Sequence, residues 1–251
     1  MLTILFLGDI VGRGGRHAAL TSLPKLRELY NPDFILANAE NAAAGFGITP
    51  DIAEDLLTAG IDLLTLGNHA FHRPEICEYL NETERVLRPA NFPPNTPGKG
   101  VGIISRNGKT LAVLNLIGRV FIGEYDDPFR TADTLLNQLQ PSNPHAILID
   151  FHAEATSEKQ ALADYLDGRV SAVIGTHTHV QTADNQILPK GTAYISDAGM
   201  CGPTQSIIGM EISTVLKRFL TLMPTRFEVA KGPATLSAVV VKVNDTTRQA
   251  Q

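Results

Sequence analysis

Short apolar runs alternate with helical patterns along most of the chain. Five runs have the length and continuous apolar character of strands buried on both faces: residues 2–7, 33–37, 61–66, 146–150 and 170–174. Other segments place apolar residues at helical spacing, and these are residues 16–30, 73–80, 131–140, 157–166 and 211–220. Strands that alternate with helices in this way predict an α/β fold with mixed sheets covered by helices.

Turn and cap residues separate these elements. Thr49 and Pro50 predict the start of a further helix, with Thr49 as its N-cap, and Gly60 predicts its end. The Asn107-Gly108 pair lies between two apolar runs and predicts a hairpin. The glycine-rich residues 12–15 predict a turn before the first helix.

The segment 89–130 has the least core-like composition. Its first part, residues 89–100, is rich in proline and predicts an ordered loop. We therefore predict that 89–130 is a loop or lid insertion over the site, within a single domain that spans 1–251. Two late apolar runs, 192–196 and 234–243, predict strands near the C-terminus.

Polar residues follow five of the predicted strands. Each strand is followed by a carboxylate, an amide or an imidazole, and the residues in chain order are Asp9, Glu40, Asn41, Asn68, His69, His152, His177 and His179. Ligands of open α/β sheets bind in the crevice beyond the carboxyl ends of the strands. If these strands are parallel neighbours, we expect the polar side chains to converge there.

A metal centre explains this set better than separate structural roles do. Taken singly, Asp9 is typical of a turn or helix cap and His152 of a strand end, whereas His177 and His179 share one face if their segment is extended. Oxygen and nitrogen ligands without thiolate suit manganese, iron or zinc. Seven candidates are too many for one tetrahedral zinc ion, so two metals with one bridging carboxylate are expected: Asp9, Glu40, Asn41, Asn68, His152, His177 and His179.

Composition narrows the setting. The net charge of −5 over 251 residues argues against stable nucleic-acid binding by phosphate neutralisation. A small anionic substrate would therefore need a local positive centre, such as an arginine or a metal. Cys77 and Cys201 form no CxxC pattern, residues 1–9 look like a strand and not a signal peptide, and no run is long enough to span a membrane. We predict a cytoplasmic protein with no membrane partner, and the sequence leaves a homo-oligomer open.

The motifs resemble those of the calcineurin-like metallophosphoesterase superfamily. The resemblance rests on GD at residues 8–9, GNH at 67–69, His152 and GTHTH at 175–179. More narrowly, the chain is similar to a bacterial branch that hydrolyses phosphodiesters such as 2′,3′-cyclic nucleotides, through the segments LGDIVGRGGR, NAENAAAGFGIT, LGNHAF, DFHAEATSEK and GTHTHVQTAD. The resemblance implies a four-layer α/β/β/α sandwich with two mixed β-sheets.

The resemblance also implies a role for each candidate ligand. One metal would be held by Asp9, Glu40, Asn41 and His179, and the other by Glu40, Asn68, His152 and His177. Iron is the expected occupant, with manganese next and zinc third. A hydroxide that bridges the metals would attack phosphorus, and His69 would steady the phosphoryl oxygens and protonate the leaving group.

Two departures from the superfamily pattern leave alternatives open. Asp9 lacks the histidine two residues later, and Ala70 replaces the acid that would orient His69. The same site would also suit a phosphomonoesterase, or a regulatory protein with a weakly active metal site. Among weaker candidates, Arg13, Arg16 and His72 would approach the substrate.

Overall fold

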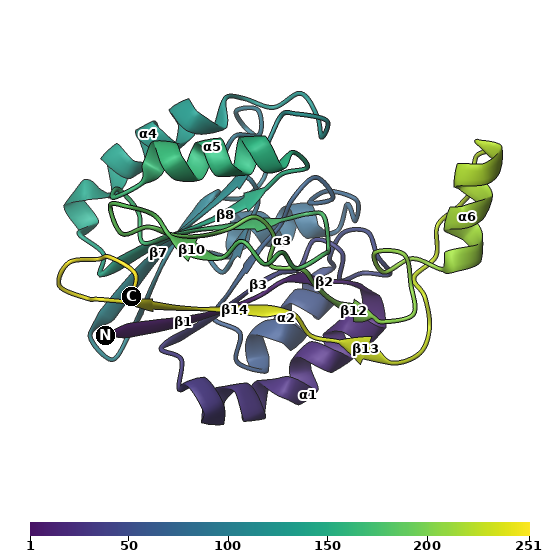
Figure 1. Ribbon diagram of the computed structural model, residues 1–251, viewed down its shortest axis with the longest axis horizontal. Coiled ribbons are helices and arrows are strands. Elements are labelled where there is room, and N and C mark those ends of the chain that lie inside the picture. The colour runs from purple at the N-terminus through teal and green to yellow at the C-terminus, as the bar shows by residue number, and fades with distance from the viewer.

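The computed structural model describes residues 1–251 and contains two large sheets that lie face to face (Figure 1). The first has the strand order β14-β1-β3-β4-β5, with bounds β14 (Ala238–Val243), β1 (Leu2–Leu7), β3 (Phe34–Asn38), β4 (Leu63–Thr65) and β5 (Val86–Leu87). Strands β1, β3, β4 and β5 are parallel, and β14 runs antiparallel to β1. The sheet is therefore mixed, as predicted.

The second large sheet is also mixed. Its order is β10-β11-β9-β8-β7-β6, with bounds β10 (Gln186–Ile187), β11 (Ala193–Ile195), β9 (Ala172–Thr176), β8 (Ala146–His152), β7 (Lys109–Ile117) and β6 (Val101–Arg106). A small third sheet of order β13-β12-β2 joins β13 (Ala234–Thr235), β12 (Met200–Pro203) and β2 (Asp9–Ile10). Strand β8 is buried along its whole length, which explains its nearly continuous apolar sequence.

Six α-helices accompany the sheets: α1 (Gly12–Tyr30), α2 (Pro50–Thr58), α3 (Ile76–Glu82), α4 (Pro128–Leu139), α5 (Thr156–Leu166) and α6 (Ile212–Thr221). A short 3-10 helix, Gln140–Ser142, follows α4. Helices α1 and α2 lie outside the first sheet and α4 and α5 outside the second, whereas α6 projects away from the body (Figure 1). None of the six combines the length and the apolar character that crossing a bilayer requires.

Three apolar cores hold these layers together. One contains Phe6, Leu36, Leu148 and Ile174, and thus lies between the two large sheets. The other two fill the outer faces, beneath α1 to α3 on one side and beneath α4 and α5 on the other. The order of layers is helices, sheet, sheet, helices, and the α/β class with mixed sheets is confirmed.

Local signals set several element boundaries. The Thr49 hydroxyl accepts a hydrogen bond from the Ile52 amide at 3.3 Å, with Pro50 at the first helical position of α2. Asn107 and Gly108 have φ values of 52° and 76°, as a two-residue turn between β6 and β7 requires. The predicted cap and hairpin are therefore confirmed.

Three predicted elements need correction. Residues 12–15 do not form a free turn, because α1 begins at Gly12. Strands β6 and β7 lie within residues 101–117, and β7 pairs with β8 from Leu111 to Ile117. This part of the predicted insertion therefore belongs to the second large sheet. The predicted strand 234–243 is divided into β13 and β14, which belong to different sheets.

Candidate metal centre

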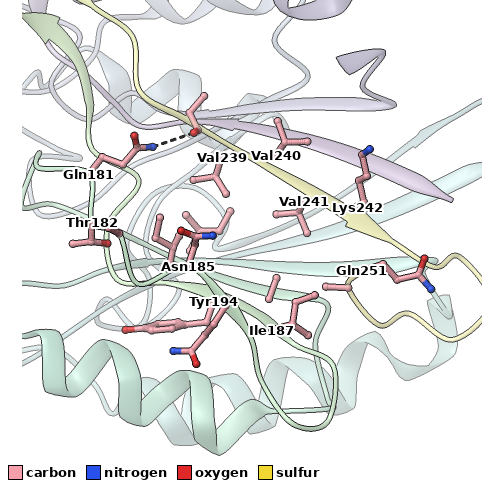
Figure 2. A pocket seen from close by; sticks show the side chains of 17 residues that line it. Gln181, Thr182, Asn185, Ile187, Tyr194, Val239, Val240, Val241, Lys242 and Gln251 are labelled. Atoms are coloured by element: carbon pink, nitrogen blue, oxygen red, sulfur yellow. Dashed lines mark hydrogen bonds between the residues drawn. The ribbon is translucent and has the colours of Figure 1, made fainter. Parts of the chain in front are cut away.

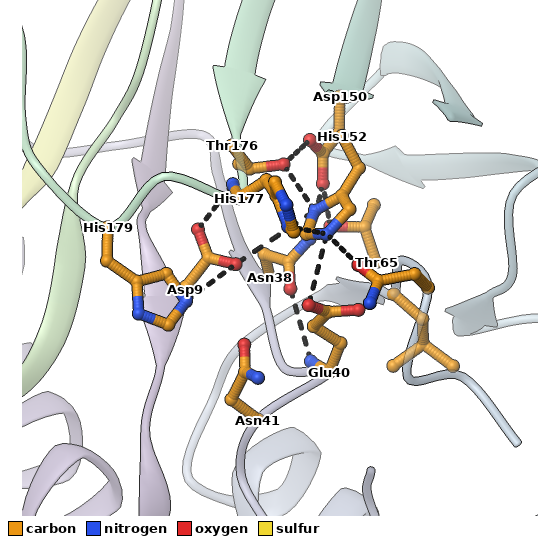
Figure 3. A network of polar contacts seen from close by, with 12 residues as sticks. Asp9, Asn38, Glu40, Asn41, Thr65, Asp150, His152, Thr176, His177 and His179 are labelled. Carbon is orange, nitrogen blue, oxygen red and sulfur yellow. Dashed lines mark hydrogen bonds and ion pairs between the residues drawn. The ribbon is translucent and has the colours of Figure 1, made fainter. Parts of the chain in front are cut away.

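The strand ends bring the predicted ligands together (Figure 3). Asp9 lies on β2, Glu40 and Asn41 follow β3, Asn68 follows β4, His152 ends β8, and His177 and His179 follow β9. Asp9, Glu40, Asn41 and His152 are each at most 3% exposed. Because β3, β4, β8 and β9 run parallel to their neighbours, their carboxyl ends meet on one side of the two sheets.

Three potential ligand atoms lie close to Nε2 of His152, which is the fourth. Its Nε2 lies 3.0 Å from Glu40 Oε1, 3.0 Å from Asn68 Oδ1 and 3.0 Å from His177 Nδ1. A ring nitrogen carries a single proton, so it can make only one good hydrogen bond among these three acceptors. A metal cation would satisfy all four atoms at once, and Glu40, His152 and His177 also form a group whose ligand atoms lie within 4.8 Å of one another. We call these four residues the histidine-rich position.

The remaining ligands leave buried oxygens without partners. Asp9 Oδ1 and Asn41 Oδ1 are both buried and accept no hydrogen bond. His179 Nε2 approaches Asp9 Oδ1 at 3.8 Å. Unpaired buried acceptors are costly, and a cation is the partner that suits a carboxylate and an amide oxygen together. We call Asp9, Asn41 and His179, together with Glu40, the oxygen-rich position.

Gly67 keeps the space between these residues open. A Cβ atom at this position would lie 2.3 Å from His152 Nε2 and 2.5 Å from Glu40 Oε2. Any side chain would therefore displace two candidate ligands. The chain needs glycine before Asn68 because the backbone of this loop approaches the centre so closely.

Burial and mutual charge shift the pKa values of the acidic and basic ligands. Burial raises the pKa of Asp9 to about 7, although His179 and His152 oppose the shift. Burial alone would raise the pKa of Glu40, but the charge and hydrogen bond of His152 outweigh it and lower the pKa to about 2. Burial alone would lower the pKa of His152, but Glu40 raises it to about 9. A proton shared by Glu40 and His152 thus supplies positive charge where a metal would lie.

A hydroxyl and a carboxylate orient His152 from behind. Thr176 Oγ1 donates its proton to Asp150 Oδ1 at 2.7 Å. Thr176 Oγ1 therefore accepts the hydrogen bond from His152 Nδ1 at 2.9 Å. Asp150 is fully buried and also accepts from Asn38 Nδ2 at 3.0 Å and from the Thr65 hydroxyl. This chain of bonds keeps the proton on Nδ1 and leaves Nε2 free to bind a metal.

The other two histidines have orienting partners of different kinds. His177 Nε2 lies 3.2 Å from Glu154 Oε2, so Nδ1 faces the histidine-rich position. Burial lowers the pKa of His177 to about 3, which keeps the ring neutral as a ligand must be. His179 Nδ1 donates to the Ile208 carbonyl at 2.8 Å, which directs its Nε2 towards Asp9.

The prediction that His177 and His179 share one face of an extended segment is wrong, although both rings reach the centre. Strand β9 ends at Thr176, so the two histidines do not alternate along an extended strand. His177 has a φ of 98° and His179 a φ of 66°, in the left-handed region that residues with a Cβ rarely adopt. Two strained residues in a turn bring the rings to different positions, which strand geometry alone would not do.

His69 lies at the edge of the centre. Its backbone amide donates to Glu40 Oε2 at 2.9 Å, and its ring Nδ1 lies 3.2 Å from His72 Nδ1. His72 thus contacts the His69 ring, which has no carboxylate partner at position 70 because Ala70 stands there. Burial lowers the pKa of His69, and Phe46 meets its ring edge-on at 5.1 Å between centroids.

A pocket of about 660 Å³ opens over the centre. Its lining combines the polar residues Glu40, Asn41, His69, His177 and His179 with the apolar side chains of Phe46, Met210, Phe219, Leu222 and Phe227. Arg218 lines this pocket and was not predicted, because nothing in the sequence links α6 to the strand ends.

The two predicted arginines do not line this pocket. Arg13 is exposed on α1, and Arg16 donates to the Ala42 carbonyl. A second groove of about 560 Å³ lies between β14 and the β10–β11 edge, and none of the predicted site residues lines it (Figure 2).

Three relatives are similar to this chain over nearly its whole length. A Bacillus subtilis protein named 2′,3′-cyclic-nucleotide 2′-phosphodiesterase is 53% identical over 99% of this chain and 94% of its own. A solved structure of a hypothetical protein from Thermus thermophilus is 46% identical, with a TM-score of 0.93 over 99% of this chain and 96% of its own. The crystal structure of a novel phosphatase from Mycoplasma pneumoniae is 34% identical, with a TM-score of 0.93 over 100% and 90%.

Fold and strand-end residues together place the chain in the metallophosphoesterase class. A family model described as YmdB-like protein matches residues 5–251. The chain belongs to this YmdB-like family, and the resemblance that the motifs indicated is confirmed.

Proposed function

We propose that this protein is a dimetal-dependent phosphodiesterase that hydrolyses small phosphodiesters such as 2′,3′-cyclic nucleotides. The observation that carries the proposal is the cluster around His152 Nε2, where three acceptor atoms lie at 3.0 Å. The name of the Bacillus subtilis relative supports the substrate class. The pocket of about 660 Å³ is in the range of small-molecule sites.

The residues present fit two metal ions. Asp9, Glu40, Asn41 and His179 would hold one, and Glu40, Asn68, His152 and His177 the other. When bound, such a pair supplies a nucleophile from water and stabilises the charge that develops on the phosphoryl oxygens. Oxygen and nitrogen ligands suit iron, manganese or zinc, and the resemblance to the bacterial branch implies iron first, then manganese, with zinc third. Cys201 is buried with its pKa raised to about 12, so no thiolate competes at the centre.

His69 would deliver the proton that the leaving alkoxide needs. Its ring lines the pocket beside Glu40 and is held through the contact with His72. Burial lowers the pKa of His69, which makes its imidazolium form a stronger acid towards the leaving oxygen, and the negative charge of Glu40 opposes the shift and favours that protonated form. Arg218, which also lines the pocket, would attract an anionic substrate.

Turnover of 2′,3′-cyclic AMP by protein loaded with iron or manganese tests the proposed activity. We expect hydrolysis that a chelator abolishes and that either metal restores. Protein that has two bound metals but hydrolyses no phosphodiester would overturn the proposal.

The role of His69 has its own test. His69→Ala should lower kcat for a ribose leaving group by about 10²–10⁴-fold while both metals remain bound. The loss should be much smaller for bis-p-nitrophenyl phosphate, because p-nitrophenolate leaves without a proton. Equal losses on both substrates would show that His69 does not protonate the leaving group.

A phosphomonoesterase remains the second candidate, since the Mycoplasma pneumoniae relative is named a phosphatase. Both activities would use the same metals and differ only in what surrounds them. Rates on bis-p-nitrophenyl and mono-p-nitrophenyl phosphate, measured side by side, separate the two. A cytoplasmic location is also proposed, which cell fractionation tests, and light scattering distinguishes a monomer from the homo-oligomer that the sequence leaves open.

A further inference from the structure

A buried ion pair lies directly behind the two histidines of the centre. Lys159 Nζ on α5 lies 2.9 Å from Asp197 Oδ2, in the loop after β11. Lys159 is 2% exposed and Asp197 1% exposed. Removing two charges from water costs several kcal/mol per ion unless the pair makes further hydrogen bonds. Neither residue belongs to the proposed ligand set, so the pair needs another explanation.

Asp197 holds the residue between the two histidines. Its Oδ2 accepts from the Thr178 amide at 3.0 Å and from the Thr178 hydroxyl at 2.8 Å. Thr178 lies between two residues with left-handed φ values, 98° at His177 and 66° at His179. Such a conformation is strained for a residue with a Cβ and persists only when its surroundings fix it. Two charge-assisted hydrogen bonds to Thr178 provide that constraint.

The other oxygen of Asp197 reaches the strand that carries Asp9. Asp197 Oδ1 accepts from the Gly199 amide at 2.8 Å, and the Gly199 carbonyl accepts from the Asp9 amide at 3.0 Å. Gly199 has a φ of 77°, and Gly8 cannot carry a Cβ, which would lie 2.0 Å from the Gly199 oxygen. One carboxylate therefore connects the histidine turn to the backbone of Asp9.

Lys159 makes a charged carboxylate tolerable in this place. Asp9 and Asp197 are close enough that the charge of Asp197 contributes to the raised pKa of Asp9. The Lys159 ammonium neutralises Asp197, and its stem packs on β9, where a Cβ at Gly175 would lie 3.0 Å from Lys159 Cδ. Without Lys159, Asp197 would be a buried carboxylate without a counter-ion.

We propose that Asp197, supported by Lys159, is a positioning residue that fixes the His177–His179 turn against Asp9 and thereby sets metal affinity at the oxygen-rich position. This inference rests on the metal centre of the proposed function. The effect falls mainly on one position because His179 and Asp9 both belong to it. His177 has an additional contact, between its Nε2 and Glu154 Oε2 at 3.2 Å, so we expect the histidine-rich position to depend less on Asp197.

Titration of the metal-free protein with Mn²⁺, followed by calorimetry, tests this assignment. We expect two binding events in the wild-type protein. In Asp197→Asn, one amide nitrogen must face donors that now bond to an oxygen, either Lys159 and Thr178 or Gly199. The weaker constraint should reduce affinity for one ion by about 10–100-fold, as removal of an orienting partner typically does, and leave the other ion nearly unaffected.

Asp62→Asn is the matched control for this substitution. Asp62 is 7% exposed, accepts from the Ile35 amide at 2.8 Å and pairs with Arg106, but it precedes β4 and so lies at the opposite strand end from Asn68. The same chemical change should lower the unfolding temperature without changing either Mn²⁺ affinity. Equal loss of affinity in both variants would overturn the positioning role.

A milder pair of variants covers the case in which Asp197→Asn does not fold. Thr178→Val removes only the hydroxyl bond to Asp197, whereas Thr178→Ser keeps it. We expect Val to weaken one Mn²⁺ event by a few-fold and Ser to restore it. Wild-type affinities in Thr178→Val and Asp197→Asn would overturn the proposal. Wild-type protein that binds fewer than two Mn²⁺ ions would instead overturn the metal centre, and the positioning role with it.

Discussion

The two proposed metal positions share Glu40 but are held in opposite ways. At the histidine-rich position the ligand atoms lie close together, with 3.0 Å from His152 Nε2 to each of Glu40 Oε1, Asn68 Oδ1 and His177 Nδ1. At the oxygen-rich position they lie further apart, with 3.8 Å from His179 Nε2 to Asp9 Oδ1, and two oxygens have no partner. One position is held together by a shared proton, and the other by the backbone and buried charges around it.

This difference has a consequence for metal binding. An ion at the histidine-rich position must displace the proton that joins Glu40 and His152, and it gains ligands that are already close together. An ion at the oxygen-rich position satisfies oxygens that are otherwise unpaired, but the ligand spacing depends on residues 197–199. Metal affinity at the histidine-rich position should therefore respond to substitution of Thr176, which contacts His152. Metal affinity at the oxygen-rich position should respond to substitution of Asp197, which contacts Thr178.

Glu40→Gln should have the largest effect, because it removes the one ligand that both positions share. We expect neither ion to bind tightly and turnover to fall by at least about 10³-fold, since several kcal/mol of transition-state stabilisation depends on the metals. Metal content and kcat measure the outcome. Glu158→Gln is the control, because Glu158 is 8% exposed but only accepts from the backbone amides of Arg119 and Val120. Two tightly bound ions in Glu40→Gln would contradict a bridging role.

His177→Ala and His179→Ala should separate the positions. Each removes a direct ligand, so the loss of affinity should exceed the roughly 10–100-fold loss typical of an orienting partner. His179→Ala should abolish one Mn²⁺ event and His177→Ala the other. If both variants lose the same event, the assignment of the two histidines to different ions is wrong.

Thr176→Val should produce a smaller and selective effect. It keeps the shape of the side chain but removes the hydroxyl between His152 Nδ1 and Asp150. We expect about tenfold weaker binding at the histidine-rich position and no change at the other. Thr65→Val is the control, since Thr65 also donates to Asp150 but does not contact His152. Equal effects from both variants would place the cause in Asp150 and not in the orientation of His152.

The dependence of metal binding on pH should be the mildest effect. The pKa values of Asp9, about 7, and His152, about 9, are both raised, and both groups must lose a proton before they can bind a metal. Affinity should therefore rise with pH between about 6 and 8, by about tenfold per pH unit for each proton displaced. Calorimetry in buffers of different ionisation enthalpy counts these protons. Affinity that falls as pH rises would contradict both shifts.

The sequence predicted which polar side chains the fold brings together, because these side chains follow strand ends. Asp9, His152 and His179 are polar residues directly after apolar runs, and parallel strands bring such residues to one edge. The turn at 12–15 was mispredicted from composition, because four glycine-rich residues indicated a turn where α1 begins at Gly12. The hairpin around Asn107-Gly108 was predicted, but its place in the second large sheet was not, because pairing between β7 and β8 leaves no local signal in the sequence.

The orienting residues could not be predicted in the same way. Asp150 lies within a buried strand, Glu154 in a loop, and Asp197 follows a short strand, so none carries a distinctive pattern. Their roles depend on contacts across long sequence separations, such as Thr178 with Asp197 and Thr65 with Asp150. Only the folded chain reveals which acid supports which histidine.

The three histidines differ in whether a point mutation can replace the group that orients the ring. His152 is hydrogen-bonded to a threonine hydroxyl and His177 contacts a glutamate carboxylate, and both partners are side chains that mutation can exchange. His179 donates a hydrogen bond to the backbone carbonyl of Ile208, which every amino acid at that position would also present. The partners that orient His152 and His177 can thus be exchanged directly by point mutation, whereas point mutation reaches His179 only indirectly, through the contact between Asp197 and Thr178.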